Sequence, residues 1–215
     1  MNAEPLRFAW RDGDVSGARD APAESRVATL VWAHGAGGDM NHPSPSGVAH
    51  GLAEAGIEVF RFNFPYREAG RRAPDKQDRL EACYWGVAKE VASSADRLFL
   101  GGGSMGGRIA SHIVADGFPA AGLAFQSYPL HAPGKPERMR DAHLRRIAVP
   151  MLFVSGTRDS FASGDLLDRT VASLPNATLH RIEGADHGLK VKGRSQQDVV
   201  AEVVTTIAGW IARIA

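Results

Sequence analysis

The hydrophobic residues of this chain fall into short runs that polar, glycine-rich segments separate. Apolar runs without a regular polar alternation are typical of strands that are covered on both faces of a sheet. Such runs, with one more mixed segment near the C-terminus, predict strands over residues 27–33, 57–64, 98–100, 121–126, 149–154 and 177–182. The chain therefore carries the strands of a largely buried sheet.

Between these runs, apolar residues recur every three or four positions, which predicts helices. The expected helices cover residues 46–55, 74–92, a segment that follows residue 104, residues 164–173, and a last segment that starts at 195. The last helix opens on a capping-box pattern, Ser195-x-x-Asp198. Strands that alternate with helices predict an α/β fold: a mostly parallel sheet, right-handed crossovers and helices on both faces.

Three segments depart from this alternation. Residues 6–10 and a second short stretch after Asp12-Gly13 predict an antiparallel hairpin at one edge of the sheet. The polar residues 17–26 predict a loop, and residues 127–148 predict an irregular connection. We find no internal repeat and no linker, so residues 1–215 are expected to form a single domain.

Net charge, cysteine content and the lack of long apolar runs exclude several classes of protein. The net charge of +1 gives no general case for binding nucleic acid or an anionic membrane. Cys83 is the only cysteine, which excludes an internal disulfide and a cysteine-based zinc site. The N-terminal residues lack the signature of a secretory signal, and no apolar run reaches membrane-spanning length. We therefore expect a cytoplasmic protein without a metal or a cofactor.

The motif Gly102-x-Ser104-x-Gly106 lies where a predicted strand turns into a predicted helix. Such a turn exposes the serine hydroxyl above a helix N-terminus, and it needs glycine because neighbouring backbone passes close by. The same letters also fit a dinucleotide-binding fingerprint, but the next strand ends in Gln126-Ser127 with no acidic residue. A phosphate-binding loop is excluded because Arg108 and Ile109 stand where Lys and then Ser or Thr should follow the last glycine. The serine turn is the best of the three interpretations.

A serine nucleophile needs a base, and the base needs a third group that holds its tautomer. Ligands of open α/β sheets bind beyond the carboxyl ends of the strands. Asp159 and His187 both follow the end of a predicted strand, so we predict a catalytic triad of Ser104, His187 and Asp159. Glu183 is the alternative candidate for the acidic member of the triad. His34 is expected to shape the glycine-rich loop that begins at Gly35.

Two backbone N–H groups are candidates for an oxyanion hole. The N–H of Met105 opens the helix that follows Ser104. The second donor is expected from the segment His34-Gly35-Ala36-Gly37, with Ala36 preferred and Gly37 as the alternative. One such donor lowers the barrier by about 3 to 4 kcal/mol.

Four motifs together resemble a known family. They are His34-Gly35-x-Gly37-Gly38, Gly102-x-Ser104-x-Gly106, Gly156-Thr157-x-Asp159 and Asp186-His187-Gly188. From residue 27 to the C-terminus the chain is similar to small α/β-hydrolases of the dienelactone-hydrolase-like kind. Strings such as Phe64-Pro65-Tyr66 and Tyr128-Pro129-Leu130-His131 resemble a little-characterised branch that includes a testis-expressed protein and a subunit of a chromatin-acetylating complex. This chain has Ser104 where true dienelactone hydrolases have cysteine, which argues against their substrate.

The resemblance implies an α/β-hydrolase fold and the three catalytic positions, but it supplies no substrate. From the predicted triad we expect a serine hydrolase that acts on a small-molecule carboxylic ester or thioester. A non-catalytic interaction protein and a perhydrolase remain alternatives. The short segment 127–148 predicts an open or shallow site without a large lid. Basic residues of two loops, expected beside the site, form either a solvated surface or a binding site for an acidic acyl group or a phosphate-bearing leaving group. These residues are Arg71, Arg72, Lys135, Arg138, Arg140, Arg145 and Arg146.

Overall fold

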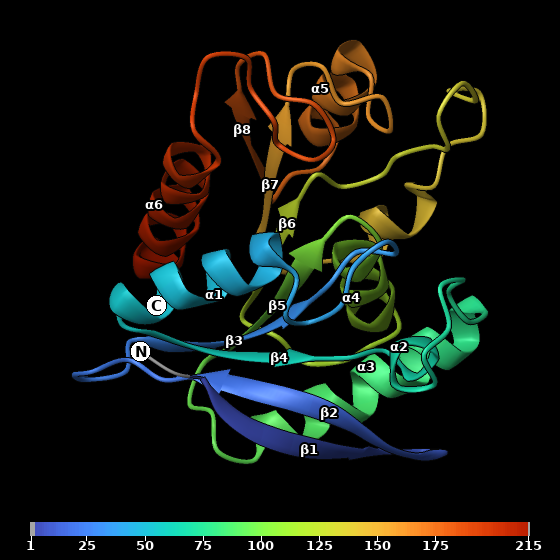
Figure 1. Cartoon of the computed structure of the whole chain (residues 1–215). Helices are drawn as coiled ribbons and strands as arrows, with labels where there is room; N and C mark the ends of the chain where they lie inside the picture. The colour runs from blue at the N-terminus through green and yellow to red at the C-terminus, as the bar shows by residue number, and fades with distance from the viewer. Residues whose placement is uncertain (1–2, 215) are drawn as a thin grey trace.

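An eight-stranded sheet runs through the whole molecule (Figure 1). The computed structural model describes residues 3–214. The strands are β1 (Glu4–Trp10), β2 (Gly13–Asp20), β3 (Ala28–Ala33), β4 (Ile57–Phe62), β5 (Leu98–Gly103), β6 (Gly122–Gln126), β7 (Met151–Gly156) and β8 (Ala177–Ile182). Their order is β1-β2-β4-β3-β5-β6-β7-β8. The pairs β1–β2 and β2–β4 are antiparallel and the other pairs are parallel, so the expected mostly parallel α/β sheet is confirmed.

Helices cover both faces of this sheet, as predicted (Figure 1). They are α1 (Pro43–Glu54), α2 (Pro65–Glu68), α3 (Gln77–Ala92), α4 (Met105–Ala115), the 3₁₀ helix η1 (Ala142–Arg146), α5 (Gly164–Ala172) and α6 (Gln196–Ile214). α1 and α6 pack together on one face, and α3 and α4 pack together on the other. Within residues 3–214, no helix is long and apolar enough to cross a membrane.

The edge hairpin is longer than the sequence indicates. β1 and β2 form the expected hairpin, but the prediction that residues 17–26 are a loop is wrong at its start, because residues 17–20 pair with β4. Asp20 is buried there and accepts a 2.8 Å hydrogen bond from Arg61 Nε. This ion pair joins β2 to β4. The polar residues at the end of β2 therefore belong to a strand, although their sequence is typical of a loop. The single-turn helix α2 was also not predicted.

The turn between β5 and α4 is tightly packed against the end of β3. A Cβ atom on Gly102 or on Gly106 would collide with the carbonyl oxygen of Ala33. These two glycines therefore let α4 start directly above β3 and β5. The parallel strands all end at this same edge, so the loops that follow β3, β5, β6, β7 and β8 meet there.

Tyr84 of α3 supports the strand that leads into this turn. Its ring is fully buried, and its hydroxyl lies 2.9 Å from Val31 O and 2.7 Å from Gly101 O. The same hydroxyl accepts a 3.0 Å hydrogen bond from the N–H of Gly101. One side chain thus satisfies backbone groups of β3 and β5 just before the chain turns.

We expect Tyr84→Phe to lower the free energy of unfolding by about 1–3 kcal/mol, because buried backbone groups lose a partner while the ring still fills its space. Urea denaturation followed by circular dichroism measures the change. A variant as stable as the wild type would show that this hydroxyl does not support β5.

Candidate active site

Ser104 occupies a strained position between β5 and α4. Its backbone has φ 50° and ψ −115°, a left-handed conformation that a non-glycine residue rarely adopts. The N–H of Ser104 donates to Gln126 O at 2.8 Å, which ties the turn to the end of β6. This arrangement places the half-buried Ser104 at the sheet edge, in the lining of a cavity.

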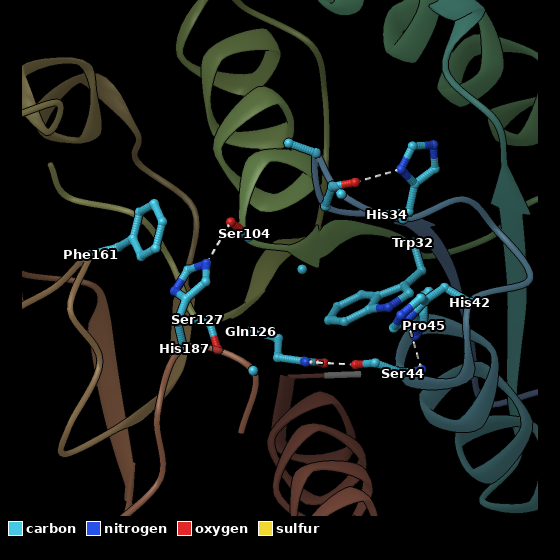
Figure 2. Close-up of a pocket in the computed structure, with 16 residues that line it drawn as sticks. Trp32, His34, His42, Ser44, Pro45, Ser104, Gln126, Ser127, Phe161 and His187 are labelled. Carbon is cyan, nitrogen blue, oxygen red and sulfur yellow. Dashed lines mark hydrogen bonds between the residues drawn. The ribbon is translucent and has the colours of Figure 1, made fainter. Parts of the chain in front are cut away.

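His187 reaches Ser104 from the loop that follows β8. Its Nε2 atom lies 2.9 Å from Ser104 Oγ (Figure 2). The neighbouring Asp186 points elsewhere: its Oδ1 accepts hydrogen bonds from the N–H groups of Gly188 and Lys190, each at 2.9 Å. Asp186 therefore shapes the loop that carries His187.

Asp159 lies on the other side of the imidazole, in the loop that follows β7. Both of its carboxylate oxygens are 2.9 Å from His187 Nδ1, and its side chain is fully buried. Its Oδ1 also accepts the N–H of Phe161 at 2.8 Å, and the N–H of Arg158 donates to Ala185 O at 2.9 Å. The two loops are thus joined to each other. With Nδ1–H facing the carboxylate, Nε2 is free to accept the serine proton.

Phe161 was not singled out from the sequence. Its ring stacks on His187 with a centroid distance of 4.0 Å and an interplanar angle of 27° (Figure 2). This contact covers one face of the imidazole and limits its rotation. In the sequence, the only indication of this role is that Phe161 lies two residues after Asp159 in the same loop.

The segment after β3 forms the opposite wall. His34 is buried, and its Nδ1–H donates to Gly35 O at 2.8 Å while its Nε2 accepts the N–H of Phe64 at 3.2 Å. The hydroxyl of Tyr66 donates to Ala36 O at 2.9 Å, and burial raises the pKa of Tyr66 to about 12, so it stays a donor. His34 therefore shapes this loop and makes no hydrogen bond with Ser104.

Ala36 lines the same cavity as Ser104, and Met105 follows Ser104 at the start of α4. Among residues 3–214, neither backbone N–H donates to another protein group. The Met105 N–H belongs to the first turn of α4, where such groups lack a helical partner. Both residues therefore carry a backbone donor without a protein partner.

A cavity of about 460 Å³ opens above Ser104 and His187 (Figure 2). Among the described residues, no Asp, Glu, Lys or Arg lines it. None of the basic residues expected beside the site lines the cavity, although Ser127, at the start of the second loop, does. Arg71 pairs with Asp75 instead, and Arg146 pairs with Asp116 on the outer surface.

Other candidate groups lie apart from Ser104. Glu183, the reserve acid, accepts a 3.3 Å hydrogen bond from Thr157. His112 stacks on His143, and burial lowers the pKa of His112 to about 4 and that of His143 to about 3. Cys83 is buried, and burial raises its pKa. Within residues 3–214, no group of three or more His, Cys, Asp or Glu side chains could hold a metal ion.

Comparison with known proteins agrees with this architecture. A family model described as "Alpha/beta hydrolase domain" matches residues 26–212. The fold is similar to an alpha-beta serine hydrolase homologue from Coxiella burnetii (TM-score 0.75, 20% identity, 99% of this chain and 97% of that one). It is also similar to an a/b serine hydrolase without lid from Xanthomonas campestris (TM-score 0.72, 21% identity, 100% and 94%). A dienelactone hydrolase from Anabaena variabilis matches with TM-score 0.77 and 15% identity over 99% and 97%.

We expect the free energy of unfolding to fall as the pH drops from 6.5 to 4, in part because of His34. Burial lowers the pKa of His34 from 6.5 to about 4, so in this window the unfolded chain binds a proton that the folded chain does not. The contribution is on the order of 3 kcal/mol. Urea denaturation at pH 7 and pH 4.5 measures it, and His34→Gln should lose less stability than the wild type. The half-exposed His50→Gln is the control and should keep the wild-type loss; an equal loss in His34→Gln would contradict this account.

Proposed function

This chain belongs to the alpha/beta hydrolase domain family, and we propose that it is a serine hydrolase of carboxylic esters or thioesters. One observation carries the proposal. The hydroxyl of Ser104, the imidazole of His187 and the buried carboxylate of Asp159 form a continuous hydrogen-bonded chain at a cavity. This is the arrangement that turns a weak serine nucleophile into an effective one.

In the proposed acylation step, Ser104 Oγ forms a bond to the carbonyl carbon while His187 Nε2 accepts the serine proton. Asp159 orients the ring and stabilises the imidazolium that forms. The carbonyl electron pair moves onto oxygen, and the N–H groups of Met105 and Ala36 donate to that oxyanion. The carbonyl then re-forms, the bond to the leaving group breaks, and His187 protonates the departing alcohol or thiol.

Deacylation repeats these steps with water. His187 takes a proton from the water as its oxygen attacks the acyl carbon, and it returns that proton to Ser104 as the acid leaves. No cofactor enters this scheme. Phe161 would hold the ring in place through both halves of the cycle.

The cavity wall favours an uncharged substrate. Without a Lys or Arg side chain in the wall, a carboxylate or phosphate would lose its water and gain no counter-ion. We therefore no longer expect the acidic acyl group or the phosphate-bearing leaving group that the basic loops suggested.

A non-catalytic interaction protein is less well supported, because a scaffold has no use for a hydroxyl, an imidazole and a carboxylate aligned in a cavity. A perhydrolase would use the same three residues, and assays with and without peroxide separate it from an esterase. The narrower resemblance to the branch with a testis-expressed protein and a chromatin-complex subunit stays a prediction, as does a cytoplasmic location.

We expect a fluorophosphonate probe to label the wild-type protein and not Ser104→Ala, because the probe bonds only to an activated serine. Gel fluorescence after a short incubation measures the labelling. The exposed Ser93→Ala is the matched control and should label like the wild type. Folded wild-type protein that fails to label would favour the non-catalytic alternative.

We also expect kcat/KM for 4-nitrophenyl butyrate to exceed that for the 4-nitrophenyl half-ester of succinate by at least about tenfold, because the anionic end finds no cation in the cavity. Initial rates by absorbance at low salt give the comparison. A preference for the anionic ester would mean that a basic side chain reaches the substrate after all.

A further inference from the structure

A second cavity, of about 480 Å³, lies where α4 packs against η1 and the segment before it. Its wall includes Arg108 and His112 of α4, Arg140 of the connection between β6 and β7, and His143 and Arg146 of η1. It shares no lining residue with the cavity that holds Ser104. The proposed hydrolytic mechanism uses none of these groups.

The charged residues of this wall are all basic. Among the described residues, no Asp or Glu lines the cavity, and Asp141, which follows Arg140, is outside the lining. Two acidic side chains approach the wall residues from elsewhere. Asp116 Oδ1 lies 3.0 Å from Arg146 Nη2, and Glu81 Oε1 lies 3.6 Å from His112 Nδ1. A ligand in the cavity therefore faces cations and no carboxylate of the lining.

The basic groups lie close together. Arg108 Nη1 donates to His112 Nε2 at 3.1 Å, and the His112 ring stacks on His143 with a centroid distance of 3.7 Å. Burial lowers the pKa of His143 to about 3, and the charges of Arg108 and Arg146 contribute to that shift. Burial also lowers the pKa of Arg108, and the charge of Arg140 lowers it further. Because like charges at this range repel each other, the cavity favours an anion.

The three arginines have donors to spare. Within residues 3–214, the exposed side chain of Arg140 makes no hydrogen bond and no ion pair. In their hydrogen bonds to protein groups, Arg108 uses only Nη1 and Arg146 only Nη2. The remaining nitrogens of the half-buried Arg108 are not sealed from solvent. A guanidinium carries several N–H donors, so each arginine can still donate to a ligand.

A phosphate group matches these donors best. The planar guanidinium forms paired hydrogen bonds with the oxygens of phosphates and carboxylates. A phosphate monoester offers more acceptor oxygens and more negative charge than a carboxylate, which suits three arginines that converge from two segments. The cavity volume of about 480 Å³ is in the range of sites for small molecules.

We propose that the cavity bounded by Arg108, Arg140 and Arg146 binds the phosphate group of a small molecule. The site is separate from the cavity at Ser104, and the inference does not depend on the proposed hydrolase function. From the sequence, Arg140 and Arg146 were expected beside the active site, where they would recognise an anionic part of the substrate. They line this second cavity instead, so the anion they bind is a ligand in its own right.

The test is isothermal titration calorimetry at low salt, with inorganic phosphate, glycerol 3-phosphate and, as the uncharged control, glycerol. We expect at least one of the two phosphates to bind with a Kd on the order of 1 mM or below, and glycerol not to bind. Added sodium chloride should weaken the binding. The tighter of the two phosphates identifies the source of the group, which is either free phosphate or a phosphate ester. A ligand-dependent rise of the Tm gives a second measurement of binding.

Arg140→Gln removes a guanidinium that has no protein partner, so the fold is kept and the Kd should rise by about tenfold. Arg108→Gln should raise the Kd as well. Arg145→Gln is the matched control: it removes the same charge from η1, but Arg145 is exposed and does not line the cavity. It should keep the wild-type Kd, as should Ser104→Ala.

Four results would overturn the proposal. The first is that neither phosphate binds the wild type, by calorimetry or by Tm. The second is wild-type affinity in both Arg140→Gln and Arg108→Gln. The third is an equal loss of affinity in Arg140→Gln and Arg145→Gln, which would reduce the effect to the general charge of this surface. The last is a loss of binding in Ser104→Ala, which would place the ligand in the other cavity.

Discussion

The close approach of the β5–α4 turn to the carbonyl oxygen of Ala33 is the constraint on which the site depends. Only glycine fits at positions 102 and 106, because a Cβ atom at either would collide with that oxygen. The backbone between them has no room to relax, and Ser104 is held at φ 50°. Strain of this kind persists only where the surrounding packing enforces it. Here the packing comes from β3, from β6 through Gln126 O, and from Tyr84 beneath the strand.

The other half of the site is formed by the loops that follow β7 and β8, which are hydrogen-bonded to each other. The N–H of Arg158 donates to Ala185 O, and the carboxylate of Asp159 meets the imidazole of His187. A Cβ atom on Gly156 would collide with Ala185 O, so the two loops cross in direct contact. Because each loop leaves a parallel strand of the same buried sheet, their spacing is set by the strand pairing of β7 and β8.

The sequence was sufficient for the elements whose signal is local. The apolar runs, the glycine turn at Ser104 and the strand-end positions of Asp159 and His187 can all be recognised within short segments. Contacts between distant segments could not be found in this way. β2 includes the polar residue Asp20 because its carboxylate accepts a hydrogen bond from Arg61 on β4. Phe161 belongs to the site only because its ring stacks on His187, which lies in a different loop. The basic residues were expected beside the site because their ion pairs cannot be recognised from the sequence: Arg71 pairs with Asp75, and Arg146 pairs with Asp116.

The connection between β6 and β7 contains only the short 3₁₀ helix η1 as regular structure, so no helical lid covers the cavity in the described part of the chain. Access to Ser104 then needs no opening step and no lipid–water boundary to trigger one. The portion of a substrate that projects from the mouth stays in bulk solvent, where its size is unconstrained. For the proposed hydrolase, an acyl group attached to a polymer or to another protein would be as open to attack as one on a free metabolite.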